Sequence, residues 1–125
     1  MQSGQWIYND TISYDINIPD TTICGELTIG IRHNNNYPYR NIWIELTHCD
    51  SNAILHSRDT VNIELCDVYG KWHGNGVGSS YQISYILPKS ITISSKDKLQ
   101  LRHIMRIDTL HGIEQLGFIL NRANL

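Results

Sequence analysis

Apolar and polar residues alternate along most of this chain. Within residues 23–33, four apolar side chains share one face, and Glu26, Thr28 and Arg32 take the opposite face. A period of two residues is that of a β-strand, whose successive side chains point to opposite sides of the sheet. The same period predicts further strands at residues 11–18, 41–48, 60–68, 81–87, 91–94, 98–105 and 116–120.

About eight short strands separated by turn residues are typical of two antiparallel sheets packed face to face. We therefore predict an all-β chain, folded as an antiparallel β-sandwich of jelly-roll type. Only residues 108–116 could hold a helical turn, just before the last strand. With 125 residues and no linker or repeat, the chain is predicted to form one sandwich domain over residues 1–125.

The composition is that of a soluble globular domain, with 41% hydrophobic residues, 18% charged residues and a formal net charge of −2. Lysine and arginine do not cluster, so nucleic acid is not an expected partner. No apolar segment is long enough to cross a bilayer, and the first residues lack the basic and apolar regions of a signal peptide. We expect no cofactor.

The chain contains three cysteines, Cys24, Cys49 and Cys66, and their spacing matches no metal-binding CxxC pattern. Two interpretations remain open. The cysteines can be small buried apolar residues, or two of them can form a disulfide and leave one free thiol.

The segment GKWHGNGVGSSY, residues 70–81, is rich in glycine. A nucleotide-binding loop leads into a helix, and the P-loop ends in Lys-Ser or Lys-Thr. Here a predicted strand follows, and Lys71 stands at the start of the segment. We therefore predict a backbone role, in which Trp72 packs against the glycines where a bulged segment crosses between the sheets. The predicted structural glycines are Gly70, Gly74, Gly76 and Gly78.

No catalytic or metal-binding pattern is evident. The six histidines form neither HxH nor HExxH, and no serine lies in a GxSxG motif. The carboxylates of Asp59, Glu64 and Asp67 could form a glycosidase pair, but nothing distinguishes one pair from another. We predict no enzyme and no metal site, with an unrecognised hydrolase as the least favoured alternative.

Two arginines are candidates for structural ion pairs. Arg32 ends a predicted strand, and Arg106 lies next to the last apolar residues of another. A partly buried arginine needs a carboxylate, and Asp59, Asp67 and Asp108 are available. The alternative is that either arginine docks a partner.

Several aromatic side chains are predicted to lie outside the core. Trp43 alternates with two isoleucines and so points away from them, and Trp6 lies near the terminus. Each such ring can be covered by a loop, anchor a protein interface or stack on a sugar. The candidate contacts with a partner or a glycan are Tyr37, Tyr39, Trp43 and Trp72.

Three motifs together resemble a known family. They are RHNNNYPYRNIWI (32–44), DTVNIELCDVYGKWHGNGVGSSY (59–81) and MRIDTLHGIEQLGFIL (105–120). Their order and spacing are similar to those of the GldH family of gliding-motility lipoproteins from Bacteroidetes-type bacteria. That family has Arg-His before Tyr-Pro, Asp-Thr before Gly-x-Trp-x-Gly-x-Gly, and Met-Arg before Gly-Ile and a final strand.

The resemblance implies a non-enzymatic, periplasm-facing protein of the cell envelope, held by a lipid on an N-terminal cysteine. It implies that the signal peptide and this cysteine lie upstream of Gln2, so the anchor is absent from the present chain. The expected role is in gliding motility or the associated protein secretion, through contacts with other envelope proteins. The alternative is a carbohydrate-binding β-sandwich module.

Overall fold

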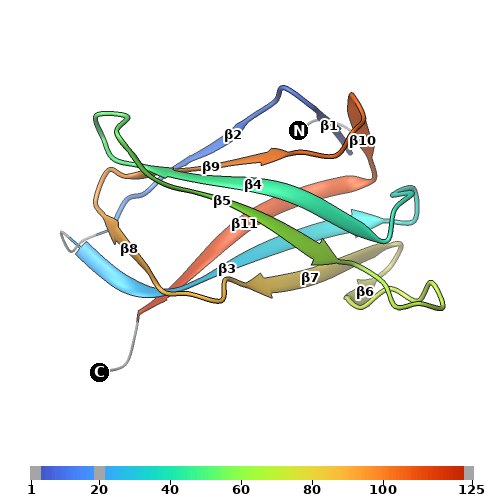
Figure 1. The fold of residues 1–125 in the computed structure, drawn as a ribbon. Helices are drawn as coiled ribbons and strands as arrows, with labels where there is room; N and C mark the ends of the chain where they lie inside the picture. Colours follow the sequence, from blue (N-terminus) through green and yellow to red (C-terminus); the bar gives the residue numbers. More distant parts are fainter. Residues whose placement is uncertain (1–3, 19–21, 123–125) are drawn as a thin grey trace.

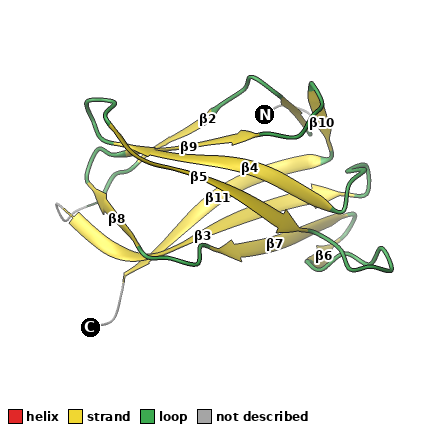
Figure 2. Ribbon diagram, in the orientation of Figure 1, coloured by secondary structure: helices red, strands yellow, loops and turns green. Residues whose placement is uncertain are grey.

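The computed structural model describes residues 4–18 and 22–122, and within them the chain is all-β (Figure 2). The described segments include no helix long and apolar enough to cross a membrane. The strands are β1 (Gln5–Ile7), β2 (Ile12–Asp15), β3 (Thr22–Asn34), β4 (Asn41–Cys49), β5 (Leu55–Glu64), β6 (Asn75–Val77), β7 (Ser80–Ile86), β8 (Ile91–Ser94), β9 (Lys98–His103), β10 (Thr109–His111) and β11 (Ile113–Arg122).

The strands pair in antiparallel fashion and form three sheets. A four-stranded sheet has the order β2-β9-β4-β5. A five-stranded sheet has the order β11-β3-β7-β6, and β8 pairs with the first residues of β3. The third sheet is the pair β1-β10. Figure 1 shows the two larger sheets as layers lying one over the other.

One hydrophobic core is shared by the two larger sheets. Leu27 and Ile29 of β3 are fully buried, as are Ile44 of β4 and Leu101 of β9, and all four belong to one cluster. Burial of a side chain of this size stabilises a fold by about 1.5–3 kcal/mol. The alternating pattern of the sequence therefore places one face of each sheet in the same core.

The predicted all-β class is confirmed, and each of the eight predicted segments overlaps a strand. The predicted count was too low, because the structure has eleven strands among the described residues. The strands β1, β6 and β10 were missed because three residues are too few to show an alternation of apolar and polar side chains. The predicted helical turn at 108–116 was wrong. This segment contains β10, Gly112 and the start of β11, because β10 pairs with β1.

The glycine-rich segment leads into a strand, as predicted, and not into a helix. It forms the β6–β7 hairpin after the chain has crossed from the four-stranded to the five-stranded sheet. The ring that lies near its glycines is Tyr81, which a Cβ on Gly76 would approach to 3.5 Å. Trp72 instead packs edge-on against His33, with ring centroids 4.5 Å apart. The predicted packing partner of the glycines was therefore wrong.

The three cysteines are free thiols. Cys49 and Cys66 are buried, which fits the interpretation as small apolar residues. Cys24 is exposed, so that interpretation does not hold for it.

Two histidines are completely buried. His33 Nδ1 lies 3.3 Å from the carbonyl oxygen of Asn34, and His103 Nε2 lies 3.1 Å from that of Trp6. The second ring nitrogen of each has no partner among the described residues. Burial is the main cause that lowers the pKa of both side chains below the ordinary value of 6.5.

Because the pKa values of His33 and His103 are lowered, we expect the fold to lose stability in acid. The unfolded chain binds protons near pH 6.5, whereas the folded chain takes them up only at lower pH, so the free energy of unfolding falls as the pH drops below about 6.5. Urea unfolding at pH 7.5 and 5.5 measures the loss. His33→Gln and His103→Gln should each flatten this dependence, and the exposed His111→Gln should not. An unchanged dependence in both buried variants would contradict the assignment.

Candidate functional site

A recess of about 550 Å³ opens where β4 begins and where the chain leaves β9. We call it the Trp43 recess. The Trp43 side chain is 41% exposed, because its neighbours on β4 take the inward positions. The recess has one cation and no carboxylate in its lining, which consists of Asn41, Trp43, Ile104, Met105 and Arg106.

Backbone contacts hold the two sides of the Trp43 recess together. The amide of Ile104 donates to the carbonyl oxygen of Trp43 over 3.0 Å, which continues the β4–β9 pairing by one step. The amide of Trp43 lies 3.3 Å from the sulfur of Met105 and donates to it. The backbone of Trp43 is therefore tied to the side chain of Met105.

A second recess, of about 200 Å³, shares residues 104–106 with the Trp43 recess. Its remaining lining residues are Tyr8, Ile107 and Asp108. Ile107 is 37% exposed. Residues 104–106 therefore border both recesses.

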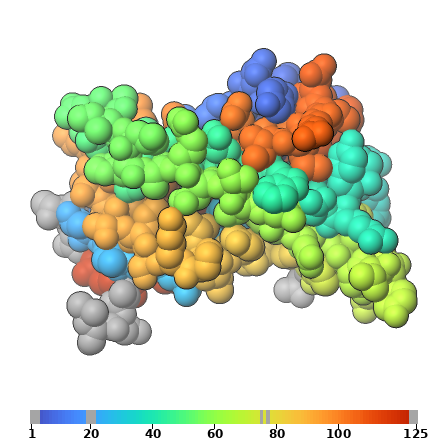
Figure 3. Space-filling model, in the orientation of Figure 1, coloured from blue at the N-terminus to red at the C-terminus, as the bar shows by residue number. Residues whose placement is uncertain are grey.

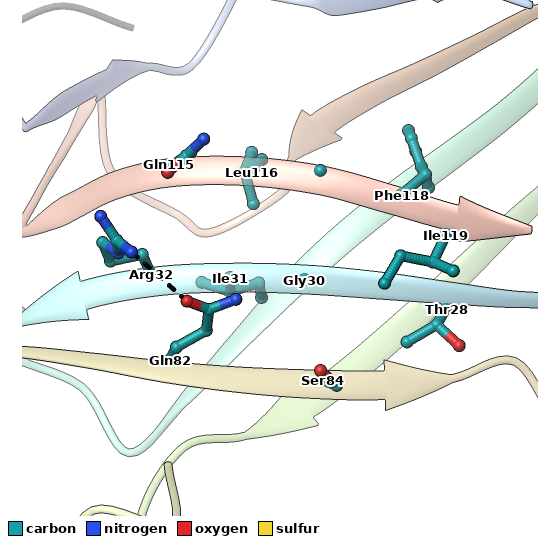
Figure 4. Close-up of a pocket in the computed structure, with 11 residues that line it drawn as sticks. Thr28, Gly30, Ile31, Arg32, Gln82, Ser84, Gln115, Leu116, Phe118 and Ile119 are labelled. Carbon is teal, nitrogen blue, oxygen red and sulfur yellow. Dashed lines mark hydrogen bonds between the residues drawn. The ribbon is translucent and has the colours of Figure 1, made fainter. Parts of the chain in front are cut away.

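A third recess, of about 220 Å³, lies on the outer face of the five-stranded sheet (Figure 4). We call it the glycine recess. The strand register aligns Gly117 of β11, Gly30 of β3 and Ser84 of β7 in one row across its floor. A Cβ on Gly117 would meet nothing within 4 Å, and one on Gly30 would lie 3.9 Å from the nearest oxygen. Packing therefore does not require glycine at either position.

The walls of the glycine recess are polar on one side and more apolar on the other. Two residues along the strands from the glycine row, the next outward row on one side is polar and consists of Gln115, Arg32 and Gln82. Arg32 and Gln82 point toward each other in Figure 4, with 3.5 Å between Nη2 and Oε1. In the opposite direction the next outward row contains Ile119 and Thr28.

The carboxylate of Glu114, the residue before Gln115 of the glycine recess, is held by neutral donors. Ser80 Oγ donates to Glu114 Oε1 over 2.6 Å, and Asn34 Nδ2 donates to Oε2 over 3.0 Å. The bond from Ser80 is the largest cause that lowers the pKa of Glu114, followed by the bond from Asn34. Glu114 is therefore ionised at neutral pH, and Arg32 contributes only through space.

The open floor predicts that larger residues stabilise the sheet. Glycine inside a strand costs about 0.5–1 kcal/mol relative to alanine, and threonine favours a strand still more. Gly30→Thr with Gly117→Thr should therefore raise the free energy of unfolding by about 1–2 kcal/mol. Chemical denaturation measures the change. Gly25→Thr is the control and should destabilise, because its Cβ would overlap the backbone of Asn121. A loss of stability in the double variant would contradict an open floor.

The predicted pairing of the arginines with aspartates is not found in the described part of the chain. Asp59 pairs with Lys89 at 3.1 Å instead. Asp67 accepts hydrogen bonds from the amides of Tyr69 and Lys71, which help to lower the pKa of its carboxyl group. Arg32 lines the glycine recess, and Arg106 lines the Trp43 recess.

The four candidate aromatics do not form one platform. Tyr37, predicted to contact a partner from its loop, is buried, and its hydroxyl donates to the carbonyl oxygen of Asn41 over 2.6 Å. Burial raises the pKa of Tyr37. Tyr39 is half-buried and packs edge-on against Tyr37, and Trp72 donates through Nε1 to Asn35. Of the four, Trp43 presents the exposed ring.

The sequence did not indicate the most exposed apolar side chains. Val68 is 71% and Tyr69 is 92% exposed, on a turn stabilised by Asp67. Figure 3 shows this segment projecting from the body at the right-hand end. Its signal was the Asp-Val-Tyr-Gly stretch, which has the aspartate and the glycine of a tight turn.

Residues 4–18 and 22–122 contain no cluster of possible metal ligands. No group of three or more His, Cys, Asp and Glu side chains there could hold a metal ion. Gly70, Gly74 and Gly78 lie in the turns and bends that flank β6. What the surface offers instead is the Trp43 recess and the glycine recess, which combine apolar side chains with one arginine each.

Comparison with known proteins identifies a family that matches most of the chain. The family model described as GldH lipoprotein matches residues 1–120. The chain belongs to this family. The gliding motility lipoprotein GldH of Flavobacterium johnsoniae is 22% identical over 95% of this chain and 79% of its own length. The gliding motility lipoprotein GldH homolog of Christiangramia forsetii is 24% identical over 96% of this chain and 79% of its own length. No solved structure shows significant similarity to the chain.

The GldH match confirms the family that the three motifs predicted. As a lipoprotein family, GldH implies a lipid anchor in the cell envelope. Two of the three motifs, 32–44 and 105–120, contribute side chains to the Trp43 recess. The first motif supplies Trp43, and the last supplies Met105 and Arg106.

Proposed function

We propose that the chain is the globular domain of a lipid-anchored, periplasm-facing envelope protein that performs no catalysis. In this proposal it takes part in gliding motility or in the associated protein secretion, and it acts by binding other envelope proteins. The observation that carries the proposal is the match of the GldH lipoprotein family to residues 1–120.

The surface of the molecule supports a binding role. Tryptophan, methionine and arginine are enriched in protein interfaces, and all three line the Trp43 recess. We further infer that the domain is a single β-sandwich over residues 1–125, since its two larger sheets contribute to one core cluster. The jelly-roll connectivity stays a prediction.

The carbohydrate-binding alternative has less support. A sugar-binding face needs exposed rings on which to stack, and three of the four candidate rings are buried or half-buried. The exposed ring, Trp43, lies among apolar neighbours that suit a protein side chain better than a sugar hydroxyl.

Removal of the protein from its source bacterium tests the proposed function. We expect the cells to lose gliding, or to export fewer proteins to the cell surface. Supplying the full-length protein with its own anchor should restore the lost behaviour. Cells that glide and export proteins normally without the protein would contradict the proposal.

A further inference from the structure

We propose that the Trp43 recess docks a protein segment in which an acidic residue adjoins a large apolar side chain. This inference deepens the proposed function and rests on it in one respect, namely that the partner is a protein. It names the surface that binds and the chemistry of what it binds.

The apolar part of the site is the Trp43 ring beside Met105 and Ile104. The Trp43 residue is 41% exposed, so covering its indole ring with an apolar side chain of the partner favours binding. A methionine next to it adapts its shape to different partners. Interface residues of this kind supply most of the binding energy of a protein contact.

The electrostatic part of the site is Arg106. Its side chain is exposed, it forms no ion pair with any described residue, and no carboxylate lines the recess with it. A guanidinium group pairs with a carboxylate through two parallel hydrogen bonds. The charge of the recess therefore complements an aspartate or glutamate of the partner.

The site is organised before the partner arrives. The hydrogen bonds from Ile104 to the Trp43 carbonyl and from the Trp43 amide to Met105 tie the Trp43 backbone to residues 104–106. Little backbone order remains to be gained on binding, which favours affinity. A sugar would find only Asn41 and Arg106 as polar partners in this lining.

Peptide display tests the proposal directly. A random dodecapeptide library is selected on the immobilised domain, and the enriched sequences are compared with those selected on two variants. Wild type should enrich an aromatic or aliphatic residue next to Asp or Glu. Trp43→Ala should weaken binding of these peptides by about tenfold or more. Arg106→Glu should exchange the acidic preference for Lys or Arg.

Arg58→Glu is the matched control, because Arg58 is an exposed arginine that lines a different recess. It changes the net charge equally and should leave the acidic preference unchanged. Circular dichroism shows whether all variants are folded. Two results would overturn the proposal: enriched peptides that bind Arg106→Glu and wild type alike, or the absence of any acidic–apolar preference. Quenching by N-acetylglucosamine oligomers that disappears in Trp43→Phe would also overturn it, in favour of a glycan.

Complementation separates this inference from the proposed function. Full-length Trp43→Ala with Arg106→Glu should fail to restore gliding or export to cells that lack the protein. The control variant Ile54→Ser with Leu55→Ser changes exposed apolar residues at the β4–β5 turn and should restore them. If removal of the protein has a phenotype and the recess variant corrects it, the inference fails while the proposed function stands.

Discussion

Replacement of Trp6 by alanine is expected to destabilise the fold by about 3–5 kcal/mol. The Trp6 side chain is completely buried, and its ring lies edge-on to His103 with centroids 5.2 Å apart. Its Nε1 donates to the carbonyl oxygen of Asp10 over 2.8 Å. Alanine would leave a cavity and lose the hydrogen bond to Asp10, and it would remove the buried side chain of β1. Urea unfolding at pH 7.5 measures the loss.

Trp43→Ala is the matched control for this prediction. It makes the same chemical change at a ring that is 41% exposed, so a loss below about 1 kcal/mol is expected. Equal losses in the two variants would show that Trp6 does not belong to the core. A small loss at Trp43 also means that the binding experiments compare folded proteins.

The burial of Trp6 could not be predicted from its sequence neighbourhood. β1 has only three residues, too few for a period of two to be recognised. Trp6 is buried because it pairs with Leu110 of β10, which lies about a hundred residues later in the chain. The prediction from local sequence, that Trp6 lies outside the core, was therefore wrong.

Strand interiors were easier to predict than strand ends. The alternation within β3 reflects the buried core directly, so its predicted and observed limits agree within a residue at each end. β5 was predicted at 60–68 but extends from Leu55 to Glu64. Residues 55–60 are mostly exposed and follow the strand only because β4 pairs with them. Leu65 and Cys66 are buried outside the strand, where the chain crosses to the other sheet.

The Trp43 recess was predictable as separate residues but not as a site. The alternation within β4 indicated that Trp43 points outward, and Arg106 was a separate candidate for an ion pair or a partner contact. Their shared recess depends on the pairing of β4 with β9, which a single sequence does not specify. The glycine recess was missed, because the row of Gly117, Gly30 and Ser84 depends on the register of three strands, which a single sequence does not specify. Arg32 and Asp59 were compatible in charge, yet they lie on different sheets.

Gly112→Ala is expected to destabilise the fold by about 3–5 kcal/mol, which combines left-handed backbone strain with steric overlap. Gly112 has a φ of 91° between β10 and β11. A Cβ there would overlap the amide nitrogen of Tyr37 and lie 2.8 Å from its Cα. The Gly112 carbonyl oxygen also accepts the amide of Asn34 over 2.9 Å, so the loop cannot move away without breaking this bond. Thermal and urea unfolding measure the loss.

Gly70→Ala separates the two causes of that loss. Gly70 has a similar φ of 84°, but a Cβ there would meet nothing within 4 Å. It should therefore cost only the backbone strain of about 1–2 kcal/mol. If Gly112→Ala costs no more than Gly70→Ala, a Cβ at Gly112 does not overlap the Tyr37 backbone, and this prediction is wrong. A clearly larger loss at Gly112 would show that overlap with the Tyr37 backbone adds to the backbone strain. The buried position of Tyr37, which removed it from the candidate binding surface, would then follow from the absence of a side chain at Gly112.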